Sequence, residues 1–257
     1  MAEADTTPLI SMQGINKRFG GVTALEDVDL ELNAGEVLAI VGDNGAGKST
    51  LIKILTGVLR PTSGSMQLNG EELTMNSHSD AILYGIDAVY QTLALADHLT
   101  PAANMFLGSE LTKSFLGLEI LDNKRMRSEA ERTLRERLGV TLRSMDVPTD
   151  SLSGGQRQAI AIARAVYHSD LKVLVMDEPT AALGPRETDR TLKLIEAVRD
   201  QGLGVIVISH SLDDVFAISD RIQIMRRGRR AGVVNTSESD IASVLGIMVG
   251  AQSEQAA

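Results

Sequence analysis

Uninterrupted apolar runs and alternating runs follow one another along this chain, and each kind predicts a different strand. Three runs of four or five apolar residues are uninterrupted, namely Val37–Val41, Val173–Met176 and Val205–Ile208. Such runs favour strands buried on both faces, as in a parallel sheet. Residues 9–32 show a loose period of two instead, so they predict two or three short strands of a separate small sheet.

Helical patterns dominate from Thr92 to about Arg143 and predict a helical insertion. Residues 122–138 place apolar side chains among many charges, with Asp122 at the start as a capping residue. The apolar segments 93–96 and 104–108 predict a docking surface, although packing in a core explains the same residues nearly as well.

The last part of the chain predicts a hairpin and a final helix at about residues 238–249. Two strand-like segments, 221–225 and 231–234, flank a basic turn that contains Arg226, Arg227, Arg229 and Arg230. These arginines raise a nucleic-acid site as an alternative. We expect them to be solvated, because hairpin charges commonly are and because 34 acidic residues against 25 basic ones give a formal charge of -9. No nucleic acid is expected as a partner.

Length and composition set limits on the architecture. The 257 residues suffice for one large α/β domain or for one domain with an inserted subdomain. The chain has no cysteine, which excludes disulfides, thiolate metal sites and cysteine nucleophiles. Residues 1–5 lack the pattern of an export signal, and no stretch approaches the ~20 apolar residues of a spanning helix. We therefore expect a soluble protein that is not exported.

A glycine-rich segment joins the first uninterrupted apolar run to the helix-like Leu51–Leu55. In this setting the backbone N–H groups can wrap a polyphosphate, because glycine permits positive φ and the N-terminus of a helix favours negative charge. Lys48 would meet the β- and γ-phosphates, and Ser49 would place its hydroxyl on Mg²⁺. The pattern is a complete P-loop and predicts a nucleoside triphosphate with Mg²⁺. Its residues are Gly42, Asp43, Asn44, Gly45, Ala46, Gly47, Lys48, Ser49 and Thr50.

Polar side chains follow the two later apolar runs. Asp177 and Glu178 end one run at the carboxyl end of the strand, where α/β sheets bind ligands. Asp177 would hold Mg²⁺ directly or through water, and Glu178 would polarise the attacking water. His210 follows the other run and would contact the γ-phosphate and orient that water. The alternatives are two solvated acids and a structural histidine.

Three further places carry candidate binding groups. Gln91 follows a short apolar strand, and its amide would touch both the metal's water shell and a docked partner, unless it is an ordinary surface glutamine. Phe19 would stack on adenine, the alternative being a core phenylalanine at a turn. Residues 152–156 open a helix that runs to about Tyr167. There Ser153, Gly154, Gly155 and Gln156 form a second anion-binding device, with Ser153 as N-cap.

Taken together, the P-loop, Gln91, the Leu-Ser-Gly-Gly-Gln segment, the 173–178 strand and His210 resemble the ATP-binding cassette ATPases over nearly the whole chain. With this resemblance we expect an α/β fold with a RecA-like P-loop NTPase core, an N-terminal antiparallel β subdomain and an inserted α-helical subdomain. The expected core with its β subdomain comprises residues 1–91 and 166–257. Residues 92–165 are expected to form the helical subdomain with the signature segment.

The resemblance also implies partners. Ser153, Gly154 and Gly155 would close on the γ-phosphate held by the P-loop of a second copy, so that two chains sandwich two ATP molecules. Segments 88–91, 104–108 and 178–184 look like those of single-cassette ATPases of bacterial monosaccharide importers, of the ribose, xylose and fructose kind. The implied partners are separate transmembrane permease subunits and, indirectly, a periplasmic sugar-binding protein. The implied location is the cytoplasmic side of the inner membrane.

One departure and three alternatives remain. Gly184 stands where the family commonly has aspartate, in the loop that reaches across the dimer, which leaves communication between the two sites open. A GTPase is disfavoured, because neither Asn16-Lys17 nor Asn123-Lys124 is followed by the aspartate that guanine recognition uses. Non-transport cassettes acting on ribosomes or DNA usually carry tandem cassettes or coiled-coil arms, which we do not expect here. An importer ATPase for a solute other than a sugar is the third alternative.

Overall fold

The computed structural model describes residues 7–115, 117–167 and 170–251, and it divides the chain into two compact units. The first unit consists of the described residues within Met1–Ala88, Asp170–Glu178 and Arg199–Ala257. The second unit consists of those within Val89–Ser169 and Pro179–Val198. None of the helices in the described ranges is both long and apolar enough to cross a membrane.

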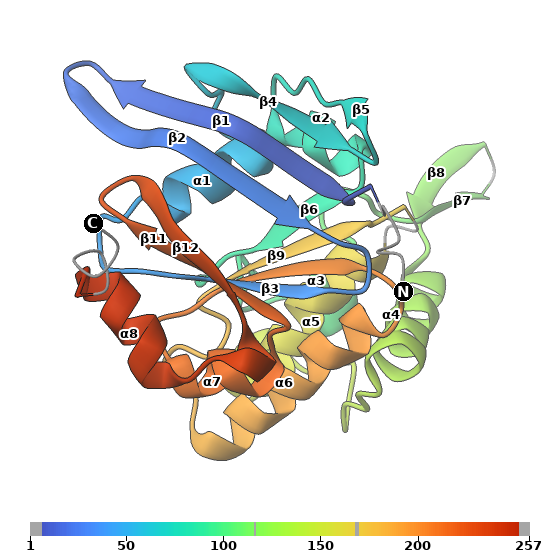
Figure 1. The fold of residues 1–257 in the computed structure, drawn as a ribbon. Coiled ribbons are helices and arrows are strands. Elements are labelled where there is room, and N and C mark those ends of the chain that lie inside the picture. The colour runs from blue at the N-terminus through green and yellow to red at the C-terminus, as the bar shows by residue number, and fades with distance from the viewer. Residues whose placement is uncertain (1–6, 116, 168–169, 252–257) are drawn as a thin grey trace. The chain divides into compact units, whose positions relative to one another are not determined.

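A six-stranded sheet runs through the first unit in the order β12-β11-β3-β10-β9-β6 (Figure 1). Its strands are β3 (Val37–Val41), β6 (Ile86–Val89), β9 (Val173–Asp177), β10 (Gly204–Ile208), β11 (Arg221–Arg226) and β12 (Arg229–Asn235). Strand β3 is parallel to both its neighbours, β10 and β11, and β10 is parallel to β9. Every residue of β3 and β10 is buried, which confirms that the uninterrupted apolar runs form central parallel strands.

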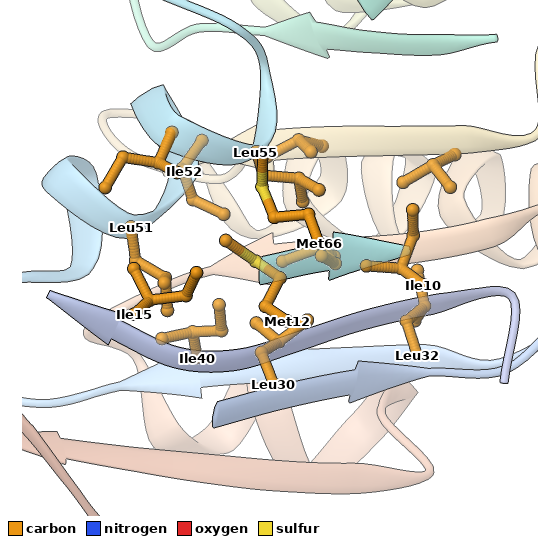
Figure 2. Packing of buried hydrophobic residues seen from close by; sticks show 14 of the residues in the cluster. Ile10, Met12, Ile15, Leu30, Leu32, Ile40, Leu51, Ile52, Leu55 and Met66 are labelled. Atoms are coloured by element: carbon orange, nitrogen blue, oxygen red, sulfur yellow. The ribbon is translucent and has the colours of Figure 1, made fainter. Parts of the chain in front are cut away.

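A four-stranded antiparallel sheet has the order β2-β1-β4-β5. Its strands are β1 (Ile10–Phe19), β2 (Val22–Leu32), β4 (Ser63–Leu68) and β5 (Glu71–Glu72). Figure 2 shows its apolar face packed with α1 (Lys48–Leu55), where Met12 and Leu30 lie in the same buried cluster as Leu51. The sequence predicted two or three short strands for residues 9–32, whereas the structure has one long hairpin of β1 and β2 there. Its register shifts around Ile15 and Lys17 blur the period of two.

Three more helices of the first unit begin at side-chain caps. They are α2 (His78–Leu83), α7 (Leu212–Ile218) and α8 (Ile241–Val249), capped by Ser77, Ser211 and Asp240. The final helix begins at Ile241 rather than at about residue 238. Asp240 accepts a hydrogen bond from the Ser243 amide at 2.7 Å, and the preceding Thr236–Glu238 forms a 3-10 turn.

The second unit is mainly helical. It contains α3 (Pro101–Met105), α4 (Asn123–Leu138), α5 (Gly154–Tyr167), α6 (Pro185–Arg199), a 3-10 turn (Thr149–Ser151) and a hairpin of β7 (Thr112–Phe115) and β8 (Leu118–Leu121). Asp122 caps α4 as predicted, since its Oδ1 accepts from the Arg125 amide at 3.1 Å. The β7–β8 hairpin is an element that the dominant helical patterns of residues 92–143 did not predict.

The apolar segment 104–108 belongs mainly to the core of the second unit. Met105 and Phe106 are buried, and the Phe106 ring meets the Tyr167 ring edge-on at 4.7 Å. Asn104 is also buried, with its amide bonded to the carbonyl of Ala96 and to the Thr149 hydroxyl. Core packing thus explains Met105 and Phe106, whereas Leu107 is 51% exposed, and a docking surface at these segments stays a prediction.

Candidate functional site

The glycine-rich loop lies between β3 and α1 in the first unit. Gly42, Gly45 and Gly47 all have positive φ, at 148°, 81° and 103°. Gly47 precedes α1 in the left-handed conformation, no side chain of the described residues caps the helix, and its first turn contains no acid. The N-terminal amides of α1 are therefore open to a negatively charged ligand.

Lys48 closes this loop from inside. Its Nζ donates to the carbonyl oxygen of Gly42 at 2.6 Å and to that of Asp43 at 3.1 Å, and the residue is buried. Among the residues that the structure describes, none forms an ion pair with Lys48, and such a buried charge is costly, so it is available for an anion held by the loop.

The hairpin turn between β11 and β12 binds the glycine-rich loop through a backbone hydrogen bond. The Gly228 amide donates to the carbonyl of Ala46 at 3.0 Å, and the Gly228 carbonyl accepts from the Glu26 amide at 2.8 Å. A Cβ on Gly42 would lie 2.2 Å from the carbonyl oxygen of Met225, so this glycine permits a close backbone approach. Sequence reasoning missed this support, because it joins segments remote in the chain.

The basic residues of the same hairpin have partners within the first unit. Arg229 forms an ion pair with Glu26, and Arg230 Nη2 lies 3.0 Å from Asp29 Oδ2, which joins the turn to β2. Arg226 packs against Gly250 at the end of α8. Arg229 and Arg230 are thus paired but remain exposed, which agrees with the expectation that the charges of this hairpin are solvated.

Glu178 directly follows β9 in a strained backbone conformation. Its φ is 52°, and its amide donates to the carbonyl of Ile208 at 2.9 Å. A left-handed residue other than glycine costs ~1–3 kcal/mol and is maintained by its surroundings, typically at functional sites. This turn directs the carboxylate to the end of β10, where His210 lies.

His210 and Glu178 are in close contact. Nδ1 of His210 lies 2.7 Å from Oε2 of Glu178, with the imidazole 74% exposed and the carboxylate 18% exposed. The contact does not have the geometry of a hydrogen bond, and Oε2 is buried without a hydrogen-bond partner. Because buried carboxylate oxygens normally accept hydrogen bonds, this oxygen is suited to receive one from a water molecule or from a reoriented imidazole.

Asp177 occupies the last position of β9. Burial raises the pKa of its carboxyl, and the neighbouring Glu178 carboxylate raises it further, whereas Lys48 and Lys53 oppose the shift. An additional cation near Asp177 would favour the ionised form. Asp177 is therefore a suitable metal ligand, directly or through water.

A hollow of about 270 Å³ brings several predicted residues together. It is lined by Val41, Gly42, Asp43, Asn44, Ser209, His210, Leu212 and Met248. The glycine-rich loop and His210 thus line the same hollow. Met248 of α8 also lines it, and sequence reasoning did not predict this residue.

Phe19 lies at the end of β1 and is 48% exposed, which excludes the alternative of a core residue. Nζ of Lys17 lies 5.2 Å from the centre of its ring. Its stacking on adenine stays a prediction.

Gln91 and the Ser-Gly-Gly-Gln segment belong to the second unit. Gln91 is exposed and follows β6, and the carbonyls of Leu93 and Ala94 shortly after it accept from Arg164 at 3.2 and 3.0 Å. Both residues have positive φ, at 55° and 47°. Arg164 is a positioning residue that sequence reasoning missed, and its only signal was a guanidinium within the apolar part of α5.

The start of α5 has the predicted cap. The Ser153 hydroxyl accepts from the Gln156 amide at 3.4 Å, and the Gln156 side chain accepts from the Ser153 amide at 3.0 Å. A Cβ on Gly154 would lie 2.6 Å from Leu183 Cδ2, so the segment packs closely against the loop that precedes α6. The exposed Ser153 and the glycine backbone offer donors to an anion.

A loop of this geometry after a central parallel strand, with carboxylates at the end of a second strand and a histidine at the end of a third, defines a P-loop nucleotide-binding protein. More particularly, the chain belongs to the ABC transporter family, whose model matches residues 25–181.

Curated relatives cover nearly the whole chain. The chain is 43% identical to the fructose import ATP-binding protein FrcA of Rhizobium meliloti, over 95% of each. It is 39% identical to the xylose/arabinose import ATP-binding protein XylG of Sulfolobus acidocaldarius, over 93% of each. The ribose import ATP-binding protein RbsA of Lactococcus lactis subsp. cremoris is 41% identical over 94% of this chain but only 48% of its own length.

Solved structures show the same fold. A nucleotide-free ATP-binding cassette from an ABC transporter superimposes with a TM-score of 0.77 at 27% identity, covering 93% of this chain and 95% of that one. The ADP conformation of another cassette gives 0.78 at 26% identity, covering 95% and 100%. The predicted α/β P-loop fold is thereby confirmed.

Proposed function

We propose that this chain is the ATP-hydrolysing subunit of an ABC importer for a simple sugar. The observation that carries the proposal is the arrangement of Lys48, Glu178 and His210, with a buried cation in the glycine loop and a buried carboxylate oxygen that has no hydrogen-bond partner. The names of the relatives at about 40% identity support ATP as the nucleotide and a simple sugar as the solute.

Lys48 and the amides at the start of α1 bind the phosphates in this proposal. Lys48 exchanges its loop carbonyls for oxygens of the β- and γ-phosphates, and Phe19 stacks on the adenine. Glu178 accepts a hydrogen bond from the attacking water, whose oxygen forms a bond to the γ-phosphorus as the bond to the ADP oxygen breaks. His210 donates to the γ-phosphate and holds the water in line.

Magnesium fits this site as a metal shared with the nucleotide. The described residues contain no cluster of three carboxylate or imidazole groups that would hold a cation alone. We assign Ser49, Asp177 and, through water, Gln91 to the ion, which is consistent with the preference of Mg²⁺ for a few protein oxygens plus phosphates. When bound, the ion neutralises charge on the phosphates.

A second copy of the chain completes each site in the proposal. Ser153, Gly154, Gly155 and Gln156 of one subunit contact the γ-phosphate bound by the other. The open donors at the start of α5 support this assignment. Binding then closes the dimer, hydrolysis reopens it, and separate permease subunits at the inner membrane receive the motion through the region of Gln91. A periplasmic sugar-binding protein supplies the solute.

The test is purification of the tagged chain from detergent-solubilised membranes, followed by reconstitution in vesicles. We expect a permease to accompany the chain and one monosaccharide, with its binding protein, to stimulate ATP turnover. The Glu178→Gln variant should bring the same permease without turnover. A chain that brings no membrane protein, or whose turnover responds only to another class of solute, would contradict the proposal.

A further inference from the structure

The second unit contains a hollow of about 760 Å³ with a cationic lining. Arg190 and Lys193 of α6 and Arg143 of the segment after α4 all line it, whereas no lining residue is acidic. Three positive side chains around one depression repel one another, and an anion between them removes that repulsion. The lining therefore favours a negatively charged occupant.

These three side chains are not engaged elsewhere. Within the described ranges, none of them forms an ion pair or a side-chain hydrogen bond. Other arginines of the same unit are paired, since Arg127 binds Asp146 at 2.5 Å and Arg132 binds Glu129 at 2.5 Å. The chain as a whole has a formal charge of -9, but the three unpaired cations make the lining of this hollow locally positive.

The rest of the lining suits an organic body. Thr141 and Ser144 contribute hydroxyl groups, and Leu138, Val147 and Leu194 contribute apolar surface. A volume in the range of ~300–1,000 Å³ is typical of small-molecule sites. Planar guanidinium groups bind phosphate oxygens in pairs, and an ammonium group adds a point charge.

We propose that the hollow bounded by Arg143, Arg190 and Lys193 binds a small organic phosphate, at a site separate from the glycine loop that Lys48 closes. The two sites lie in different compact units and share no residue. The binding itself does not depend on the proposed function.

A regulatory consequence rests on the proposed function. Ser153, Gly155 and Gln156 also line the hollow, so an occupant contacts the segment assigned to the partner's ATP. An organic phosphate bound there competes for these donors and lowers ATP turnover.

Binding is measured by calorimetry on the full chain without nucleotide, in the Lys48→Ala background to remove phosphate binding at the glycine loop. The ligands are glucose 6-phosphate, inorganic phosphate and glucose. We expect glucose 6-phosphate to bind, glucose not to bind, and inorganic phosphate to bind more weakly. The Arg190→Gln/Lys193→Gln pair and Arg143→Gln should each weaken glucose 6-phosphate binding about tenfold or more.

Matched variants test whether the charge at this place is responsible. Arg125→Gln removes an exposed positive charge of α4 that does not line the hollow, so the affinity should stay unchanged. Lys193→Arg keeps the charge and should keep the binding. Binding that survives the charge-removing variants, or no binding of either phosphate, overturns the site. Equal affinity for inorganic phosphate overturns the organic part of the proposal.

The regulatory step has a separate readout. With Lys48 intact, glucose 6-phosphate should lower ATP turnover, and the Arg190→Gln/Lys193→Gln pair should relieve this inhibition. Binding without inhibition overturns the regulatory step alone. Absent turnover in the unmodified chain, with glucose 6-phosphate binding retained, counts against the proposed function instead.

Discussion

Oε2 of Glu178 lies 2.7 Å from Nδ1 of His210 and still has no hydrogen-bond partner. The strained φ of 52° at Glu178 holds the two groups together at the ends of β9 and β10. The pair therefore combines a buried acceptor with an exposed imidazole that can turn, as the orientation of a water molecule requires.

Replacing Glu178 by glutamine removes the negative charge and turns one of the two acceptor oxygens into an N–H donor, while preserving the shape of the side chain. We expect ATP hydrolysis to slow at least ~10²-fold, because a positioned catalytic group is lost. ATP affinity should persist, and the dimer should accumulate on size exclusion with Mg-ATP. The exposed Glu72→Gln is the control and should keep normal turnover. Near-normal turnover of Glu178→Gln would remove this residue from the mechanism.

Lys48→Ala removes the ammonium group that bridges the loop carbonyls. Productive nucleotide binding should disappear, because the phosphates lose their buried positive partner. Titration with a fluorescent ATP analogue measures the nucleotide affinity. Lys124→Ala is the control, because it removes the same positive charge at an exposed position. Equal affinity in both variants would contradict the phosphate role of Lys48.

Asp177 links stability to pH. Its pKa is raised in the folded state, so the folded state binds a proton more tightly than the unfolded one, and ionisation destabilises the fold as the pH rises above ~4. Asp177→Asn should therefore raise the melting temperature of the nucleotide-free protein at pH 7. The difference should shrink as the pH falls toward ~4. A melting temperature difference that is independent of pH would show that ionisation of Asp177 is not its cause.

Gly228→Ala tests the support beneath the glycine loop. A Cβ at this residue would lie 2.8 Å from the carbonyl oxygen of Ala24, so the turn must shift and the bond to Ala46 must weaken. We expect ATP affinity to fall by about tenfold, on the scale of one or two hydrogen bonds. Gly202→Ala is the matched control, because Gly202 also has positive φ but no atom near the new Cβ. If both variants lose a similar amount of melting temperature but only Gly228→Ala loses ATP affinity, the loss comes from the contact with the glycine-rich loop and not from general backbone strain.

Arg164→Lys tests the anchor of residues 93 and 94. A lysine cannot reach both carbonyls in the same geometry, so the segment after Gln91 should open more often. Hydrogen exchange of residues 92–96 should accelerate, while exchange in α1 stays the same. Arg186→Lys on α6 serves as the control. Unchanged exchange near Gln91 would mean that Arg164 does not hold this segment.

Local patterns predicted the parts of the site that depend on neighbouring residues. The apolar run of β3, the glycines after it and the helix that begins at Lys48 are all encoded within a short stretch. The same holds for Asp122 as the cap of α4. The rule that parallel strands end on one edge of the sheet placed His210 on the same edge as Asp177, and the structure adds the direct contact between His210 and Glu178.

Long-range contacts escaped prediction. In the β7–β8 hairpin every residue of β8 is exposed, including Leu118, so this strand lacks the alternation of a half-buried strand. The ion pairs of Arg229 and Arg230 with β2 join residues from opposite ends of the chain. No periodicity reveals such partners, because the fold alone brings them together.

The bond between Gly228 and Ala46 also has a consequence for synthesis of the protein. On the ribosome the glycine loop emerges early, whereas the turn beneath it and both neighbours of β3 emerge much later. A nascent chain that ends before β11 thus has the nucleotide-binding residues without the scaffold that shapes them. We therefore expect an unfinished chain that ends before β11 to bind ATP more weakly than the whole chain.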